Sequence, residues 1–372
     1  MESFLYFPMA FTRLVSFFPI YFFAFFFCCR IFYLLTYSPR GPEYSGSASM
    51  TAFLAAGLVS IGLCAVFWGL LRRCGASGLP ELFHRQGRGF AAFCELAALL
   101  VLTGSTLSTV MNASGFLTSA VYPGAGAQIT AAAAMLVCAY GAYSGIEAVS
   151  RMALPVAAVF VAGLAVAAAG IAREIQPAYF TFAGAEAVPQ VLELFFQALY
   201  HNTEVLLFLL LTDKVRGAGT AVYARGVLVS MTFYQLSILL VTVTLGPFAY
   251  VRSYPVYSML AAAELSVVTR LDIINLLVWI LVAFVRGAAY LYCMVGCVRR
   301  LAPGLRRSHA AAGVGIGMTA LAWYLCGSLD RGLELWELWS GAAPFLLSAA
   351  IILLSVLAAL AAGKKVKSCE NG

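Results

Sequence analysis

The stretch QVLELFFQALYHNTEVLLFLLLT, residues 190–212, combines the length of a membrane span with polar side chains at helical spacing. As a continuous helix rising about 1.5 Å per residue, it would cross the roughly 30 Å of hydrocarbon in a bilayer. Five polar residues fall within about 100° of one helical face; they are Glu193, Gln197, Tyr200, His201 and Glu204. A face of this kind is costly to expose to lipid. We expect it to line a central cavity, and a hydrogen-bonded seam between helices is the alternative.

Two further polar residues, Asn202 and Thr203, lie in the middle of the same stretch. Their side chains compete with the helix backbone for hydrogen bonds. The pattern therefore predicts a break in this span, and a break in mid-membrane would free backbone amides to bind a ligand.

The composition of the whole chain is that of a membrane protein. Among its 372 residues 62% are hydrophobic, only 10% are charged, and the mean hydropathy is +0.92. A typical soluble domain has about 25% charged residues, so a soluble enzyme is excluded. The 27 Phe and 18 Tyr exclude a disordered chain. We predict an all-α integral membrane protein.

Apolar stretches of membrane-spanning length recur along the chain, separated by Pro, Gly and charged residues. No connection between them is long enough for a soluble domain, so residues 1–372 are expected to form a single transmembrane domain. About ten transmembrane helices are predicted, at residues 14–36, 51–71, 92–119, 125–146, 151–172, 190–212, 222–248, 272–298, 310–328 and 341–363.

The basic residues support this count independently. Ten spans place 16 of the 23 Lys and Arg residues in loops on one side and five on the other, while Arg30 and Arg286 lie within spans. Cytoplasmic loops carry the excess of Lys and Arg. Both termini are therefore expected in the cytoplasm, and the net charge of +7 is a topology signal and not a nucleic-acid patch.

Arg286 lies near the centre of its span, too far from either interface to reach water. It needs an anionic partner, for which Glu204 is the first candidate and Glu147 the second. In the third span, Thr106 and Asn112 could close a ligand site from the opposite side. Hydroxyls in membrane helices commonly bond back to their own helix, which is the alternative for these residues.

The sequence offers no pattern for catalysis or for a metal. Most of the ten cysteines lie inside apolar stretches as free thiols, without a Cys-x-x-Cys pair or a His/Cys cluster. None of the three histidines has a nucleophile and an orienting acid at recognisable spacing. The chain also has no Walker-type phosphate loop. We expect no enzyme activity, no cofactor and no metal.

Several short motifs occur in a familiar order: Gly145-Ile146-Glu147-Ala148-Val149-Ser150-Arg151, Pro155, Gln176-Pro177-Ala178-Tyr179, Glu204, Tyr254-Pro255-Val256-Tyr257, Arg270-Leu271-Asp272 and a span holding Trp279 and Arg286. Over residues 50–363 the chain resembles the B subunit of bacterial spore germination receptors. These are the GerB-type permeases of the amino acid-polyamine-organocation transporter superfamily. The resemblance implies two inverted five-helix repeats with broken helices one and six.

The resemblance also implies a function. The protein would be a permease-like receptor subunit that binds a small nutrient germinant, most simply an amino acid, in a mid-membrane pocket between spans one, three, six and eight. It would signal through A and C germination receptor subunits, in the spore inner membrane or the bacterial cell membrane. The alternative is a proton-coupled secondary amino acid transporter. A purely structural membrane scaffold is a third possibility.

The ligand site expected from these patterns lies at the break in span six. Amides freed around Tyr200–Thr203 would bind the carboxylate of an amino acid, and Glu204 or Gln197 would accept from its ammonium group. Two departures from the family are visible. Residues 17–27 are aromatic where such proteins usually carry glycine, and Arg286 stands where Lys is common. Arginine stays charged and cannot carry a proton.

Overall fold

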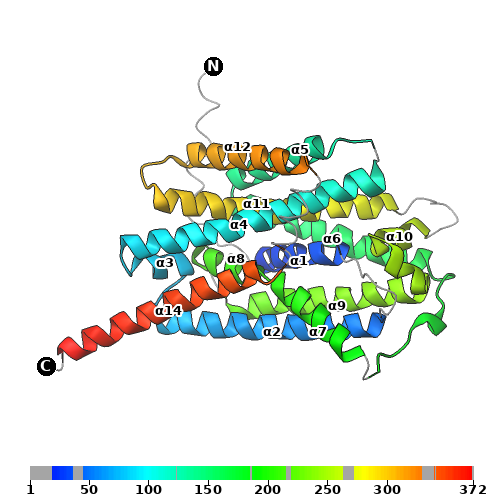
Figure 1. Cartoon of the computed structure of the whole chain (residues 1–372), viewed down its shortest axis with the longest axis horizontal. Coiled ribbons are helices and arrows are strands. Elements are labelled where there is room, and N and C mark those ends of the chain that lie inside the picture. Colours follow the sequence, from blue (N-terminus) through cyan, green and yellow to red (C-terminus); the bar gives the residue numbers. More distant parts are fainter. Residues whose placement is uncertain are drawn as a thin grey trace, which may run out of the picture.

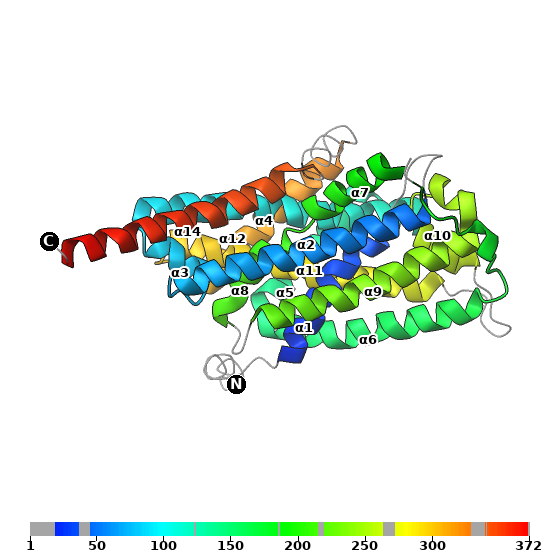
Figure 2. The same ribbon diagram turned by 90° about the horizontal axis from the view of Figure 1, so that it is seen from below.

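The computed structural model describes residues 19–36, 45–122, 124–184, 187–214, 219–262, 272–328, 339 and 341–370. Within these residues it contains helices and no strand, and the long helices lie roughly side by side along the longest axis of the molecule (Figures 1 and 2). The α-helices are α1 Pro19–Leu35, α2 Gly46–Arg73, α3 Leu79–His84, α4 Arg88–Phe116, α5 Ala127–Ser144, α6 Ile146–Gly170, α7 Val188–Tyr200, α8 Glu204–Leu211, α9 Thr220–Leu245, α10 Pro255–Ala262, α11 Asp272–Leu301, α12 Arg307–Cys326 and α14 Ala343–Glu370. Short helices of other types are η1 Leu117–Val121, η2 Pro177–Tyr179, η4 Thr212–Lys214 and η5 Gly246–Val251.

Eight helical stretches in the described part of the chain are long and apolar enough to cross a membrane, and the shorter apolar helix Ile20–Leu35 adds a ninth candidate. The chain is therefore an all-α multi-pass membrane protein. Several helices extend past the apolar stretches: α2 ends with Arg72 and Arg73, and α11 with Arg299 and Arg300. Long basic side chains at a helix end reach the interface, so the helix continues where hydropathy falls.

Helix α1 lies at the centre of the bundle and packs against α6, α9 and α11. Its phenylalanines form an aromatic core with the neighbouring helices. For example, Phe26 packs edge-on against Phe208 and Tyr223, and Phe27 packs against Phe160 and Phe233. A helix that is apolar all round is one that is covered on every side. This position accounts for the aromatic composition of residues 19–35.

The described part of α1 is continuous from Pro19 to Leu35. A break in helix one is therefore not found within these residues, and residues 1–18 lie outside the described part. The arrangement of the helices as two inverted five-helix repeats stays a prediction. After span seven and η5 the chain forms the short helix α10, and residues 263–271 lie outside the described part.

A single residue, Gly145, connects α5 to α6. Its φ of 105° and ψ of 160° belong to a region that only glycine occupies without strain. This tight turn lets α6 begin at Ile146. It also places Glu147 in the first turn of α6, where a negative charge is favourable.

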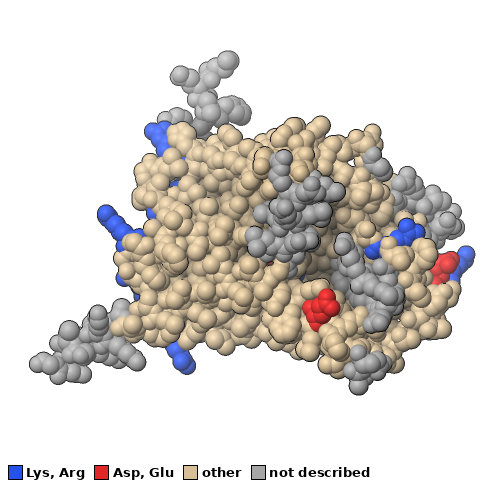
Figure 3. Space-filling view, in the orientation of Figure 1, with Lys and Arg blue, Asp and Glu red and all other residues tan. Residues whose placement is uncertain are grey.

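Basic side chains gather at one end of the bundle. We call this the basic end, defined by the ends of α2, α11 and the loops next to α3, α8 and α12, and it lies on the left in Figure 1. Figure 3 shows Lys and Arg projecting there, while the wide middle of this face carries few charged side chains. The opposite end holds η2, η5 and α10.

Candidate functional site

The sixth span is broken, as predicted. Helix α7 ends at Tyr200 and α8 begins at Glu204, with His201, Asn202 and Thr203 between them. The backbone amides of Asn202 and Thr203 bond locally, to the carbonyl oxygens of Leu199 and His201 at 3.0 and 2.9 Å. The first turn of α8 then has amides without partners inside the helix, and its dipole is positive at this end. The break therefore presents donors at the centre of the bundle.

Glu204 and Arg286 form an ion pair next to the break. The guanidinium Nη1 of Arg286 donates to Oε1 of Glu204 at 2.5 Å, and the two side chains are 1% and 0% exposed. A charged group buried this deeply is stable only when it is paired and hydrogen-bonded.

Four other groups also hold the guanidinium of Arg286. Its Nη1 donates to the carbonyl oxygen of Cys29 at 2.7 Å and its Nε to Oγ1 of Thr109 at 3.1 Å. Its Nη2 donates to the hydroxyls of Tyr33 and Tyr290. Arg286 on α11 is thus tied to α1, α4 and α8, which fixes the three helices around the break.

A hydroxyl chain completes the network on the α4 side. The hydroxyls of Tyr290 and Thr203 lie 2.9 Å apart, and Ser105 donates to Oγ1 of Thr203 at 3.4 Å. His201, on the other side, places its ring 4.9 Å from that of Tyr33, edge to face. The residues of the break therefore contact α1, α4 and α11 directly.

A second buried arginine reaches the break from α1. Nη1 of Arg30 donates to Oδ1 of Asn202 at 2.5 Å, and its Nε donates to the hydroxyl of Ser230 on α9 at 3.2 Å. Arg30 is 9% exposed and contacts no carboxylate among the residues that the structure describes. Asn202 links this second cation to the backbone of the break.

The charges of this cluster do not balance within the described residues. Arg30 and Arg286 contribute two cations, whereas Glu204 is the one buried carboxylate beside them. In addition, Oε2 of Glu204 is buried and has no hydrogen-bond partner in the described structure. Buried polar atoms are normally satisfied, so an orphan at a helix break indicates a place for a ligand.

The structure places the predicted site residues in two groups. His201 and Glu204 lie at the break, whereas Gln197 and Tyr200 lie on α7, where Gln197 is exposed and Tyr200 packs against Phe345 of α14. The side chain of Gln197 is exposed and donates to Glu193 at 3.2 Å. Tyr200 stacks on Phe196. The break changes the direction of the chain, so the polar face of a continuous helix is divided between an exposed half and a buried half.

The two predicted residues of the third span bond to carbonyl oxygens of their own helix, and Thr106 also contacts Sδ of Met294 on α11 at 3.8 Å. The hydroxyl of Thr106 donates to the carbonyl oxygen of Leu102 at 2.7 Å, and the amide of Asn112 donates to that of Ser108 at 2.8 Å. On α4, Ser105 and Thr109 are the residues that reach the break and Arg286.

Glu147, the second candidate partner of Arg286, lies elsewhere. It pairs with Arg151 one turn along α6 at 2.5 Å, with both side chains partly exposed. Its position at the N-terminus of α6 and the arginine at i+4 account for this pairing.

Several contacts of the site could not be read from the sequence. Tyr33 and Tyr290 carry no polar pattern that separates them from other aromatic residues of the spans. Arg30 is the exception, because a charge inside an apolar span indicates that a polar partner must lie nearby. The described residues contain no group of three or more side chains suited to hold a metal ion.

A broken helix with buried charges at its centre, inside a bundle of membrane-spanning helices, defines a permease-like membrane protein. The comparison with protein families agrees with this class. The family model described as spore germination protein matches residues 96–324, and the chain belongs to this family. The matched region contains the break, Glu204 and Arg286. Membership points to a transporter or receptor and away from an enzyme. No curated protein matches the chain.

Proposed function

We propose that the protein is a permease-like subunit of a germination receptor that binds a small zwitterionic nutrient, an amino acid, at the break between α7 and α8. The observation that carries this proposal is the unpartnered Oε2 of the buried Glu204. An ammonium group placed there gains a charge-assisted hydrogen bond that no described side chain supplies.

The carboxylate of the same ligand has matching donors nearby. The first turn of α8 offers free amides, and Arg30 supplies the cation that lacks a carboxylate. In this arrangement the carboxylate of the ligand pairs with Arg30, and its ammonium group pairs with the free oxygen of Glu204. In this proposal His201 borders the ligand, and Gln197 and Tyr200 join the site when α7 turns about the break. Thr106 and Asn112 stabilise α4 through their hydrogen bonds to its carbonyl oxygens.

A set of amino acid analogues tests this proposal on the purified protein. A ligand that binds the folded state raises its stability by RT ln(1 + [L]/Kd). We expect the intact amino acid to raise the melting temperature, and the analogues that lack the amino group or carry an amide in place of the carboxylate to lose this effect. Equal shifts in melting temperature with all three compounds would contradict the proposal that the site recognises both charged groups of an amino acid.

The variants His201→Ala and Gln197→Ala test whether residues at the break and on α7 contribute to ligand binding. A binding role predicts that these changes reduce the ligand-dependent shift, with the larger effect for His201, which lies at the break. A structural role predicts lower stability with the ligand-dependent shift unchanged. Unchanged shifts in both variants would place the ligand away from α7.

The second candidate function is a proton-coupled amino acid transporter. The unpartnered oxygen of the buried Glu204 favours this role, because carboxyl groups inside membrane spans mark the proton relays of transporters, whereas Arg286 keeps its charge. Counterflow of labelled amino acid in proteoliposomes, abolished in Glu204→Gln, would support transport. Absence of counterflow in a protein that binds the ligand would support a receptor.

We further propose that the protein lies in the spore inner membrane or the bacterial cell membrane and works with A and C receptor subunits. Membership in the spore germination family supports this assembly. Copurification of tagged A and C subunits with this chain is the test. Recovery of the chain alone under conditions that preserve the other two subunits as a complex would contradict it.

The orientation is proposed from the distribution of Lys and Arg, with the basic end and both termini in the cytoplasm. Tags at residues 72–89, 213–221 and 299–308 should be reached only from the cytoplasmic side, and tags at residues 173–189 and 249–270 only from the outside. Labelling from the wrong side at two of these five loops would reject the ten-span arrangement.

A further inference from the structure

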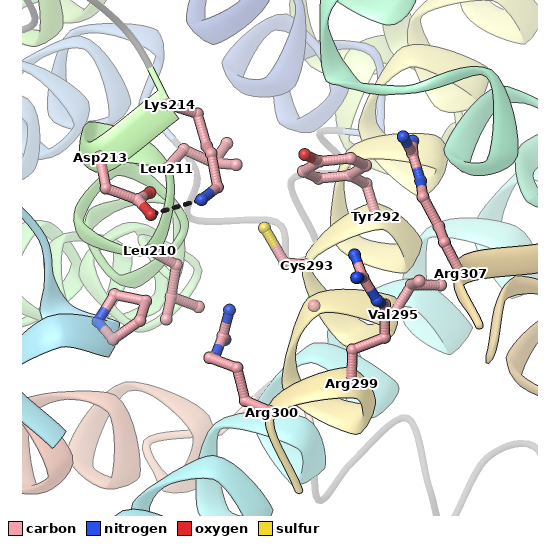
Figure 4. A pocket seen from close by; sticks show the side chains of 12 residues that line it. Leu210, Leu211, Asp213, Lys214, Tyr292, Cys293, Val295, Arg299, Arg300 and Arg307 are labelled. Carbon is pink, nitrogen blue, oxygen red and sulfur yellow. Dashed lines mark hydrogen bonds and ion pairs between the residues drawn. The ribbon is translucent and has the colours of Figure 1, made fainter. Parts of the chain in front are cut away.

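A pocket of about 290 Å³ opens at the basic end, away from the break. Leu211, Asp213 and Lys214 lie on one side of it, and Arg299 and other residues of α11 face them from the other side (Figure 4). Seven residues separate Glu204 from Leu211 along the chain, which is about 10 Å of helix. The pocket is therefore distinct from the cluster around Glu204.

The lining of this pocket is strongly basic. Four cations line it: Lys214, Arg299, Arg300 and Arg307. Asp213 pairs with Lys214 at 2.6 Å, and both Nε and Nη2 of Arg300 donate to Glu95 on α4. Two cations are thus neutralised.

The other two cations have no carboxylate partner within the described residues. Arg299 is exposed, and Arg307 donates only to the carbonyl oxygen of Tyr143 at 3.2 Å with its guanidinium near the ring of Tyr292. Both project from helix ends next to the pocket, because α11 ends at Leu301 and α12 begins at Arg307. The pocket therefore carries two net positive charges.

The other lining residues and the volume of the pocket limit which ligands could bind there. Leu210, Leu211 and Val295 add apolar side chains to the lining, beside the cations. A volume of about 290 Å³ is at the lower end of ligand pockets. Guanidinium groups bind phosphate oxygens in pairs, and basic pockets between membrane helices on the cytoplasmic side bind lipid headgroups.

We propose that this pocket binds a phosphate group through Arg299 and Arg307. The phosphate is carried by an anionic phospholipid headgroup or by a free phosphate ion, since both present the same oxygens. The opposing account is that the arginines only set the orientation of the chain in the membrane. That account assigns the same role to the neighbouring Arg306, which is exposed and does not line the pocket.

The purified full-length chain in detergent allows the first arm of the test. Its melting temperature is measured with inorganic phosphate and with chloride at equal ionic strength. In the second arm the chain is placed in vesicles of phosphatidylglycerol with phosphatidylcholine, or of phosphatidylcholine alone. We expect stabilisation by phosphate, by phosphatidylglycerol or by both. Stabilisation in the first arm identifies a free ion, and stabilisation in the second arm alone identifies the lipid.

The variants Arg299→Gln and Arg307→Gln should weaken the binding that is observed by about tenfold each, whereas the control Arg306→Gln should retain it. No stabilisation in either arm would overturn the proposal. An equal loss of binding in all three variants would also overturn the proposal, because the binding would then depend on the total charge of the basic end and not on Arg299 and Arg307. The ligand-dependent shifts with amino acids should be unchanged in these variants, which separates this site from the proposed nutrient site.

Discussion

Two arginine–carboxylate pairs of the molecule lie in contrasting surroundings. Arg286 and Glu204 lie at the centre, where their side chains are 1% and 0% exposed. Arg300 and Glu95 lie at the basic end, where Glu95 is 1% exposed but its arginine is 24% exposed. The second pair is therefore partly accessible from the surface through Arg300, and the first pair is not. We therefore expect disruption of the buried pair to lower the stability of the protein more than disruption of the pair at the basic end.

The largest effect is expected at the centre. Replacing Glu204 by Gln or Arg286 by Met leaves the other charge buried and unpaired, which we expect to lower the free energy of unfolding by about 3–5 kcal/mol. Exchanging the two residues, Glu204→Arg with Arg286→Glu, should recover part of the loss. A double-mutant cycle of denaturation measurements checks this, and strictly additive losses would show that the two groups do not interact in the folded protein.

A smaller effect is expected at the basic end. Glu95→Gln removes the negative charge of this pair and leaves one oxygen to accept from Arg300, and we expect a loss of about 1.5–3 kcal/mol because Arg300 can still reach water. The loss should also fall with added salt, unlike that at Glu204. Denaturation at two salt concentrations measures this. A loss equal to that of Glu204→Gln would contradict the role assigned to depth.

The turn at Gly145 tests backbone strain at the same end. Gly145→Ala puts a Cβ on a residue with φ of 105°, and we expect about 1–3 kcal/mol of destabilisation. Gly62→Ala on α2 is the matched control, because a Cβ there meets open space inside an ordinary helix. This control should be neutral or slightly stabilising. Equal thermal stability of the two variants would contradict the strain at Gly145.

The smallest effect is expected at Glu81, on α3 outside the spans. The hydroxyl and amide of Ser77, followed by Arg85, hold the pKa of Glu81 down at about 2. A pKa lowered from 4.5 contributes stability above about pH 4.5 and loses it as the pH falls toward 2. Glu81→Gln should cost less than about 1 kcal/mol at pH 7, because the site is exposed. The difference from the intact protein should vanish near pH 2 in denaturation curves.

In the central region, the sequence was sufficient to predict local features such as the helix break, but not the contacts between helices. Asn202 and Thr203 predicted the break because mid-span polar side chains compete with the helix, and the charge of Arg286 required a buried anion such as Glu204. The helical-wheel argument assumed a continuous helix, so it placed Gln197 with Glu204. The break separates them. Contacts of Tyr33 and Thr109 with Arg286 depend on how three helices pack, which no single-span pattern specifies.

At the basic end, the excess of Lys and Arg was visible in the sequence, but its pairing was not. Glu95 could be read as a polar residue of the third span, yet its partner Arg300 is 205 residues away. The pocket between α8, α11 and α12 likewise arises only when these helix ends meet. Charge patterns predict which end of a helix lies at an interface, and packing decides which charges remain unpaired there.

Equilibrium binding of a labelled amino acid tests the central claim most directly, namely that the break and Glu204 hold the ligand. Binding to the intact protein is compared with Glu204→Gln and with Glu147→Gln, a control whose carboxylate lies on α6 and pairs with Arg151. We predict at least about tenfold weaker binding in Glu204→Gln, because a charge-assisted hydrogen bond is lost, and unchanged binding in Glu147→Gln. Equal affinities in a folded Glu204→Gln protein and in the intact protein would contradict the account.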